Sequence, residues 1–538
     1  MPFGVFEGEG LAAVLGVLEG TDNLGFGCDC ARVNGFDVGD DDVAAGGFDG
    51  AEFGGGFEAA AVFVVLAAAE HDHAAAEGEF RVGDGVVWTG VDGVAGKAEH
   101  SAEPIDGGRC VLVAHGGHDG AWGHGKDLRW QDNALPGLRA IPWILDIGMY
   151  RRPCWVEIDT HAFEENYRLL TEAAQAEVLA VVKANAYGHG LALCAPAAVR
   201  AGARWLGVTS AEEGLEARAV CPSAEILVIS GPFPGQGAAA IAKRLTCVVW
   251  EPGQIAELER AAREAGCGAR SVPVHLELDT GMSRQGVGLD GLEAILELLP
   301  VDGPLTLDGL MTHLYAADES DGRVTREQLG LLSEAVERVQ AAGLRPGWLN
   351  VGNSAALLSG ETREELLGVA AKAGMRLMLR PGLALYGLAP EFAPEEPTEA
   401  ATLRRRLRRV LTWKTRVVSV RDVAPGRAVG YNGTFVATEP MRVALLAVGY
   451  ADGLRRELSN RGSVLVAGER APIVGRISMD QTVVDVTEIS GVKAGDEAVL
   501  LGGFGVEAIS GEEHARLAGT ISWDIFTSIS ARVERVAV

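Results

Sequence analysis

Long apolar stretches are missing from this chain of 538 residues. One candidate, residues 59–69, is too short to cross a bilayer, which takes about 20 apolar residues in a helix. A second apolar stretch, residues 11–18, follows Glu7 and Glu9 at the place where a signal peptide carries positive charge. We therefore expect neither a membrane span nor a secretory signal, and the cytoplasm is the expected location.

Paired cysteines and basic residues are also scarce. Of eight cysteines only Cys28 and Cys30 are closely spaced, a usage typical of a reducing compartment rather than of a disulfide framework. The chain carries 47 Lys and Arg against 74 Asp and Glu, which gives a net charge of −27. This excess of acidic residues argues against a nucleic-acid partner and favours a soluble protein.

Residues 1–148 contain 7 basic against 25 acidic residues, almost no lysine and many glycines. This composition predicts a disordered, low-complexity extension, or a non-native reading frame upstream of a true start at Met149. An appended domain with an interaction or sensory role is the alternative. His115, His118 and His124 lie there in a Gly-rich loop without defined ligand geometry, so no metal site is expected.

Beyond Met149 the pattern becomes that of an α/β protein. Residues 155–159 alternate like a strand, and Thr160 is the expected cap of an amphipathic helix. Short apolar runs then alternate with helical patterns, as in a (β/α)8 barrel of the TIM type. The eight runs are residues 178–183, 205–208, 226–230, 246–250, 272–278, 308–313, 348–351 and 376–380. We expect this barrel to span residues 149–400.

Residues 401–538 have a different texture. A basic connector at 404–409 precedes alternating segments typical of strands, among them residues 417–420, 443–448 and 482–486. A hairpin is expected to turn at residues 467–469. The sequence thus predicts a second, C-terminal all-β domain.

Lys183 stands at the exit of the first apolar run, in the decapeptide Val-Val-Lys-Ala-Asn-Ala-Tyr-Gly-His-Gly. A strand that delivers a lysine into a Gly-flanked loop holds the amine rigidly yet within reach, which suits Schiff-base chemistry. Apolar surroundings disfavour the ammonium form and leave a nucleophilic amine. A lysine that merely extends from a strand end towards solvent is the alternative.

The decapeptide resembles the pyridoxal-phosphate lysine motif of alanine racemases, and further family motifs follow in family order over nearly all of residues 149–538. These motifs are residues 278–284, 311–313, 379–387, 429–431, 448–453 and 475–480. The resemblance implies a cytoplasmic racemase that interconverts L- and D-alanine on pyridoxal 5'-phosphate and supplies D-alanine for peptidoglycan. A related racemase of serine or of broader specificity is the alternative. A decarboxylase of the same architecture fits the motifs less well, and a barrel-only cofactor-binding protein would lack the C-terminal domain.

The resemblance also assigns roles to single residues. The expected cofactor-binding residues are Lys183, Tyr187, His313, Asn353, Ser354, Arg380, Gly382, Leu383 and Trp523. The expected substrate-binding residues are Arg284, Tyr450 and Met479. Two bases on opposite faces of Cα are needed to remove and return a proton, and the resemblance gives these roles to Lys183 and Tyr431. In the family the tyrosine comes from the partner subunit, which implies a homodimer with shared active sites.

Arg380 and two departures from the family pattern refine these expectations. Arginine does not serve as an acid for the pyridine nitrogen, because its own pKa is above about 12. The ring is then a weaker electron sink, which limits transamination. Glu277 stands where many members have a carbamylated lysine, and it keeps one negative charge facing Arg284 without carbon dioxide. Trp523 replaces a phosphate-binding tyrosine, which puts phosphate affinity in doubt.

Overall fold

The computed structural model describes residues 152–300, 302–503 and 507–538, and short strands between residues 5 and 113. The chain divides into two compact units, residues 1–140 and residues 141–538. Residues 1–148 outside the strands, with Met149 and the three N-terminal histidines, lie outside the described residues, so the expectations for them stay predictions. The strands of the first unit are β1 (Val5–Gly8), β2 (Leu11–Val14), β3 (Arg32–Val33), β4 (Phe36–Asp37), β5 (Val64–Ala68), β6 (Phe80–Arg81), β7 (Val87–Val91), β8 (Val94–Ala98), β9 (Ser101–Ala102) and β10 (Arg109–Val113). Strands β1, β2, β5 and β10 form one antiparallel sheet.

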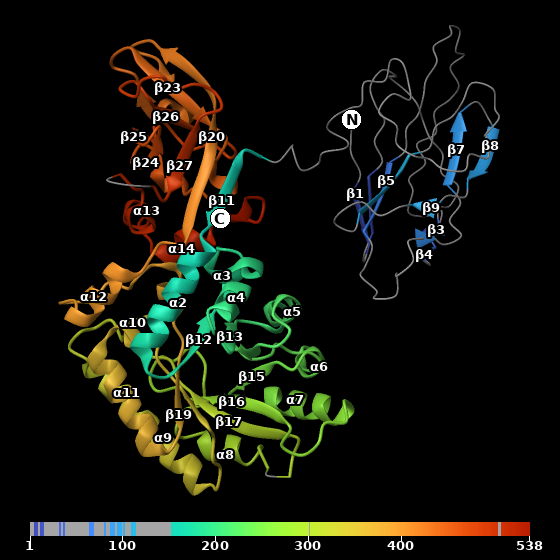
Figure 1. Ribbon diagram of the computed structural model, residues 1–538, viewed down its shortest axis with the longest axis vertical. Coiled ribbons are helices and arrows are strands. Elements are labelled where there is room, and N and C mark those ends of the chain that lie inside the picture. The colour runs from blue at the N-terminus through green and yellow to red at the C-terminus, as the bar shows by residue number, and fades with distance from the viewer. Residues whose placement is uncertain are drawn as a thin grey trace. The chain divides into compact units, whose positions relative to one another are not determined.

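The second unit contains a closed barrel of eight parallel strands, β12 to β19 in sequence order (Figure 1). Each of the eight predicted apolar runs forms one of these strands, so the barrel prediction is confirmed. The strands are β12 (Glu177–Val181), β13 (Trp205–Val208), β14 (Glu225–Val228), β15 (Thr246–Val249), β16 (Val272–Glu277), β17 (Leu305–Met311), β18 (Trp348–Asn350) and β19 (Arg376–Leu379). Such strands read as continuous apolar runs because both of their faces are covered.

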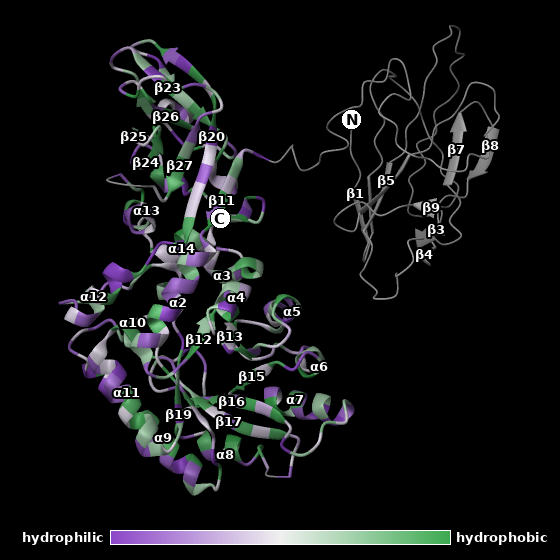
Figure 2. Ribbon diagram, viewed as in Figure 1, coloured by the Kyte–Doolittle hydropathy of each residue, from purple (hydrophilic) through white to green (hydrophobic). Residues whose placement is uncertain are grey.

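Two packed layers hold the barrel together. Side chains of one cluster fill its interior, and among them are Leu179, Trp205, Leu227 and Trp348. A larger cluster lies between the strands and the surrounding helices. These helices are α4 (Leu191–Arg200), α5 (Ala211–Val220), α6 (Gly237–Ala242), α7 (Pro252–Glu264), α8 (Leu292–Leu296), α9 (Arg323–Ala341), α10 (Ser354–Leu358) and α11 (Gly360–Ala373). Figure 2 shows hydrophobic residues on the strands and hydrophilic residues along α9 and α11.

The first strand after the N-terminal unit, β11 (Cys154–Ile158), belongs to the C-terminal sheet. It pairs antiparallel with β20 (Leu411–Val423) and parallel with β28 (Glu534–Ala537). The segment expected as barrel, residues 149–400, thus also supplies a strand of the other domain. Helix α2 (Thr160–Ala174) follows at once, and its cap is Asp159, whose side chain accepts from the Ala162 N–H. The expectation that Thr160 caps this helix is wrong by one residue, because Thr160 already has helical geometry.

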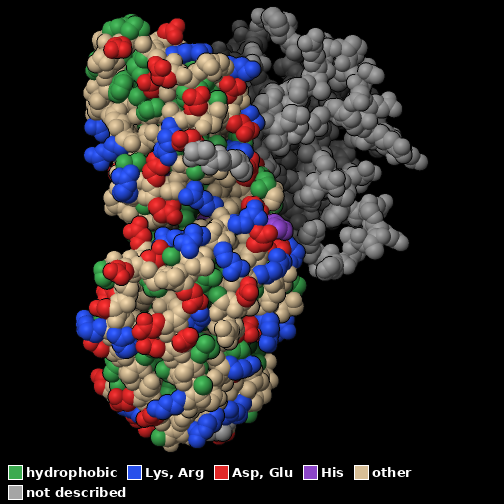
Figure 3. Space-filling model, turned by 60° about the vertical axis from the view of Figure 1, so that its left-hand side comes forward, with side chains coloured by type: hydrophobic (Ala, Val, Ile, Leu, Met, Phe, Trp, Pro, Cys, Tyr) green, Lys and Arg blue, Asp and Glu red, His purple; other side chains and the backbone are tan. Residues whose placement is uncertain are grey.

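The expected β domain is present from β20 onwards, and two short helices complete it. After α12 (Thr398–Arg406) its elements are β20, β21 (Ala428–Val429), β22 (Phe435–Val436), β23 (Met441–Leu446), β24 (Ser463–Val466), β25 (Glu469–Pro472), β26 (Thr482–Asp485), β27 (Glu497–Leu501), α13 (Gly511–Ala518), α14 (Ser522–Thr527) and β28. The predicted hairpin joins β24 to β25. Acidic and basic side chains are interspersed over the face of the described residues in Figure 3. Among those residues no helix is long and apolar enough to cross a membrane.

Candidate active site

The carboxyl ends of the barrel strands bring four predicted site residues together. Lys183 follows β12, His313 follows β17, and Arg380 follows β19, while Arg284 lies in the loop after β16. The charges of Lys183, Arg284 and Arg380 all act on His313, which places the four groups in one electrostatic cluster. This end of a barrel is where such folds carry their chemistry.

Lys183 is set up to lose its proton easily. Burial lowers the pKa of its amine most, and the nearby cations Arg284 and Arg380 lower it further. The carboxylates of Glu213 and Glu277 act in the opposite direction. Because desolvation and like charges disfavour the ammonium form, a larger fraction of the amine is free near neutral pH than for an exposed lysine.

Arg380 is a buried cation with a full set of acceptors. Its Nη1 donates to the Asn350 backbone oxygen and to Asn350 Oδ1, each at 2.6 Å, and its Nη2 donates to the Thr312 oxygen at 2.9 Å. Burial lowers the pKa of Arg380 to about 10, so the guanidinium stays charged at neutral pH. Its Nη2 also lies 3.5 Å from His313 Nδ1. Burial and the neighbouring cations lower the pKa of His313 to about 3, which leaves this imidazole neutral.

Two residues behind Arg380 were not predicted from the sequence. The Asn350 side chain, which accepts from Arg380, lies with its Nδ2 3.1 Å from His275 Nδ1 in the barrel interior. Gly309 makes room for that ring, because a Cβ there would lie 2.7 Å from it. Burial lowers the pKa of His275 to about 3, so its Nδ1 can accept the Asn350 N–H. The sequence places His275 only within the apolar run of residues 272–278 and names no partner for it.

Backbone N–H groups and hydroxyls converge where the lysine loop meets the end of β19. Ser354 Oγ accepts from the N–H groups of Gly382 and Ala384, at 3.1 and 3.2 Å. A Cβ at position 382 would overlap the Tyr187 hydroxyl, so only glycine allows this approach. Leu383 begins the 3-10 turn η1 (Leu383–Tyr386) beside them. Hydroxyls and amide N–H groups close to a glycine are the kind of groups that bind a phosphate.

The side chains of Asn353 and Trp523 make contacts within the protein, and their predicted roles towards a phosphate stay predictions. Asn353 caps α10: its Oδ1 accepts from the Ala356 N–H, and its Nδ2 donates to the Leu314 oxygen. Its side chain is thus occupied by backbone partners. Trp523 lies half-buried on α14, a helix that contacts α3 (Lys183–Tyr187), and it packs against the hydrophobic core.

Tyr431, Tyr450 and Met479 are surface residues of the C-terminal domain, exposed by 66%, 42% and 54%. Backbone hydrogen bonds join the segments of the last two: the Tyr450 N–H donates to the Ser478 oxygen, and the Ala451 N–H to the Met479 oxygen. The structure therefore brings Tyr450 and Met479 together. Large side chains this exposed are typical of surfaces that a partner covers.

Glu277 is buried at the end of β16, and its carboxylate accepts a hydrogen bond from Gln285. Burial raises the pKa of Glu277, while Gln285 and the charges of Arg380 and Arg284 lower it. The short side chain thus bonds to Gln285 and acts on Arg284 through its charge. Among the residues that the structure describes, no three His, Cys, Asp or Glu side chains are grouped as a metal site would require.

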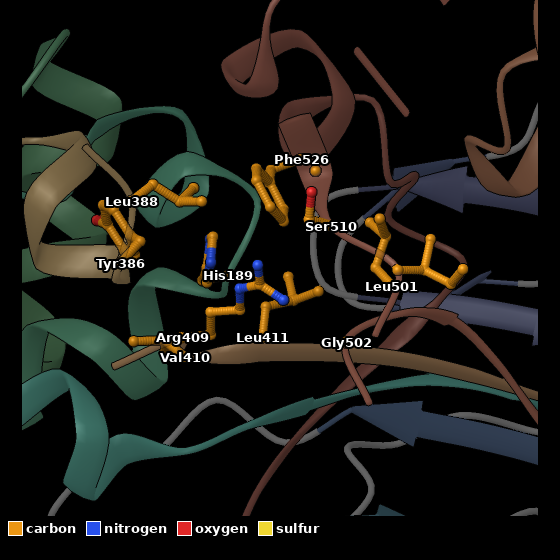
Figure 4. A pocket seen from close by; sticks show the side chains of 12 residues that line it. His189, Tyr386, Leu388, Arg409, Val410, Leu411, Leu501, Gly502, Ser510 and Phe526 are labelled. Atoms are coloured by element: carbon orange, nitrogen blue, oxygen red, sulfur yellow. The ribbon is translucent and has the colours of Figure 1, made fainter. Parts of the chain in front are cut away.

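A small cavity marks the junction of the barrel and the C-terminal domain (Figure 4). Its volume is about 10 Å³, which is room for one water at most. His189, from the lysine loop, lies there with its ring 4.4 Å from that of Tyr386 and 5.3 Å from that of Phe526. The junction therefore fixes the loop that carries Lys183 against both domains, and the cavity is too small for a substrate.

Comparison with known proteins gives the same family along both domains. The family model "Alanine racemase, N-terminal domain" matches residues 158–390, and "Alanine racemase, C-terminal domain" matches residues 410–537. An alanine racemase of Sorangium cellulosum is 40% identical over 71% of this chain and 98% of its own length. One of Symbiobacterium thermophilum is 40% identical over 71% and 97%.

Solved structures agree with these matches. The alanine racemase of Streptomyces coelicolor is 36% identical, with a TM-score of 0.64 over 73% of this chain and all of its own. That of Bartonella henselae, which holds covalently bound pyridoxal phosphate, is 28% identical, with a TM-score of 0.61 over 72% and 99%. With matches this long and this similar, the chain belongs to the alanine racemase family.

Proposed function

We propose that this protein interconverts L- and D-alanine with pyridoxal 5'-phosphate as cofactor. The observation that carries the proposal is the cluster at the end of the barrel, where a lysine of lowered pKa lies near a buried arginine, close to the hydroxyl of Ser354 and the backbone of Gly382. A lysine of this kind can bind an aldehyde, and the donors around Gly382 can hold its phosphate. The similar proteins from Sorangium cellulosum and Symbiobacterium thermophilum are alanine racemases.

Pyridoxal phosphate, when bound, supplies an aldehyde that condenses with amines and a ring that draws electrons from Cα of an amino acid. Tyr187, Ser354 and the N–H groups of Gly382 and Leu383 would hold the phosphate. Arg380 would lie against the ring nitrogen as a permanent cation that does not act as its acid. The neutral His313 and the Asn350 side chain keep the Arg380 guanidinium in place.

Lys183 and Tyr431 move the proton in this proposal. The Lys183 amine takes or returns the Cα proton on one face. The Tyr431 hydroxyl gives or takes a proton on the other face, so that Cα inverts without turning over. Arg284 holds the substrate carboxylate through a charge-assisted hydrogen bond.

Tyr431 reaches the site from a second copy of the chain. Its exposure of 66% leaves it free to enter a partner's barrel, and the exposed Tyr450 and Met479 lie on segments that backbone hydrogen bonds join. We therefore propose a head-to-tail homodimer with two shared active sites. A pair of exposed aromatic residues is a common anchor of such interfaces.

The test is a panel of L-amino acids given to the purified protein loaded with pyridoxal phosphate. D-alanine should form fastest, and L-serine should react at least about 10-fold more slowly, because one extra hydroxyl costs a fitted pocket about 1–3 kcal/mol. Faster conversion of L-serine would favour the serine racemase alternative. No D-product from any amino acid would contradict the proposal.

Residues 149–538 suffice for this activity in our proposal, since both family models match within them, at residues 158–390 and 410–537. The proposed place of action is the cytoplasm, where D-alanine enters peptidoglycan synthesis, and the free thiols of the described cysteines suit a reducing compartment. Protein truncated to start at Met149 should keep full activity and remain dimeric. Loss of either would assign a function to residues 1–148.

A further inference from the structure

The turn that carries Lys183 has a backbone that L-amino acids avoid. Ala184, Asn185, Ala186 and Tyr187 follow the lysine in sequence, and all four have φ between 51° and 54°. This is a turn of left-handed helix built from residues other than glycine. Each such residue costs about 1–2 kcal/mol, so the run persists only because its surroundings hold it.

The half of the turn next to Lys183 is held by Glu213. Its Oε1 accepts from the Ala184 N–H at 2.7 Å, and its Oε2 accepts from the Thr209 N–H at 2.8 Å. Glu213 lies in the first turn of α5, whose cap Ser210 accepts from the Glu213 N–H. One carboxylate thus bridges the ends of the neighbouring strands β12 and β13, and both bonds are charge-assisted.

Other groups hold the far half of the turn. Asn185 Oδ1 accepts from the Leu191 N–H at 2.8 Å, and Arg535 Nε from the C-terminal domain donates to the Gly188 oxygen at 3.0 Å. These contacts fix where the loop ends. The orientation of Lys183 depends on the first peptide after it, which is the one that Glu213 binds.

Glu213 also acts on the charge of Lys183. Burial and the cations Arg284 and Arg380 lower the pKa of the lysine, and Glu213 works against that lowering. Loss of the carboxylate would therefore lower the Lys183 pKa further. A residue with a purely structural role would leave this pKa unchanged.

We propose that Glu213 is a positioning residue of the active site, which holds the left-handed turn of Lys183 and so sets where its amine stands. The proposal rests on the function proposed above. It adds a residue that touches neither substrate nor cofactor, and acts on the proton transfer through the lysine.

Two variants at position 213 distinguish the effect of side-chain length from the effect of side-chain charge. Glu213→Gln keeps the size but loses the charge and one acceptor, while Glu213→Asp keeps the charge but is too short to bridge both N–H groups. Glu216→Gln is the matched control, because Glu216 is an exposed carboxylate on the same helix. Both Glu213 variants should lower kcat for L-alanine by about 10- to 100-fold with KM changed by less than about 2-fold, as a misplaced reacting group does. The control should match the parent protein.

The second readout needs no reaction. Cofactor-free protein is labelled with an amine reagent across pH, and mass spectrometry follows the Lys183 peptide. The labelling midpoint should move to lower pH in Glu213→Gln and stay in place in Glu213→Asp and Glu216→Gln.

Parent-like kcat and an unmoved midpoint in Glu213→Gln would overturn the proposal. If the parent protein racemises nothing, the proposed function fails, yet the midpoint still decides whether Glu213 acts on Lys183. Should Glu213→Gln not fold, parent-like kcat in Glu213→Asp overturns the proposal by itself.

Discussion

In the proposed function, Arg380 is the side chain that restricts a versatile cofactor to one reaction. Four acceptors surround its guanidinium, from Asn350, Thr312 and His313, and burial leaves it charged at neutral pH. Because it stays a cation, it cannot act as the acid that a stronger electron sink requires. The sequence motif predicted this residue, but its supporting network is visible only in the fold.

Replacing Arg380 with glutamate should shift the reaction from racemisation towards transamination, because a carboxylic acid at this place can protonate the ring nitrogen. The variant should also lose about 3–5 kcal/mol of unfolding free energy, since its carboxylate would face the acceptors that Arg380 now satisfies. Product analysis and urea unfolding measure the two effects, with Arg380→Lys as the charge-preserving control. An unchanged ratio of keto acid to D-alanine would refute the assigned role.

Glu277 should make the enzyme indifferent to bicarbonate. Its side chain is itself a carboxylic acid, buried beside Gln285, so no carbon dioxide adduct is needed to place a carboxyl group near Arg284. Activity in carbon-dioxide-free buffer should equal that in buffer with bicarbonate. A Glu277→Lys variant is the informative contrast, because a lysine can form a carbamate and should respond to bicarbonate. A bicarbonate response in the parent protein would contradict this interpretation.

The loop that carries Lys183 requires a glycine at position 188. Gly188 ends the left-handed turn with φ of 81°, and a Cβ there would overlap the Phe526 carbonyl of α14. Gly188→Ala should therefore displace the loop away from the C-terminal domain and abolish most of the racemase activity. Gly266→Ala is the control: its φ is also positive, at 71°, but a Cβ would meet nothing within 4 Å.

The control should cost only about 1 kcal/mol of unfolding free energy, the usual penalty of a side chain at positive φ. Urea unfolding and the rate of D-alanine formation would be measured for both variants. Equal effects of the two substitutions would show that the contact with Phe526 does not matter.

The barrel strands were predictable because parallel strands covered on both sides leave continuous apolar runs, such as residues 205–208 and 226–230. The pairing of β11 with β20 was not predictable, because about 250 residues separate the two strands. The alternation of apolar and polar residues indicates a strand but does not name its partner. The motif gave Lys183, whereas the left-handed turn beyond it depends on Glu213 and the C-terminal domain. Only the fold shows that the carboxylate of Glu213, in the first turn of α5, reaches the Ala184 N–H.

For the whole molecule, buried neutral histidines predict sensitivity to acid. His189, His275 and His514 are at most 1% exposed, and burial lowers their pKa values to about 4, 3 and 4. In the unfolded chain they take up protons near pH 6.5. Between about pH 6.5 and 4 the unfolded state thus binds more protons, and stability falls as the pH falls.

The contribution of His514 can be isolated, since it lies on α13 and is not one of the candidate site residues. Its replacement by glutamine should flatten the decline of unfolding free energy below pH 6.5 by up to about 1.4 kcal/mol per pH unit. Urea unfolding at pH 7.5, 6.0 and 5.0, at one protein concentration, measures this. Parallel curves for the parent and the variant would mean that His514 is protonated in the folded state.

Mixed dimers test the shared active site most directly, because the proposed site contains Lys183 of one subunit and Tyr431 of the other. Lys183→Ala and Tyr431→Phe chains, each with its own tag, are co-expressed and the mixed dimers isolated. One site then carries both substitutions and the other carries none, so the mixed dimer should show about half of the activity of the unsubstituted protein. Dimers made of either variant alone should be inactive. An inactive mixed dimer would contradict the shared site.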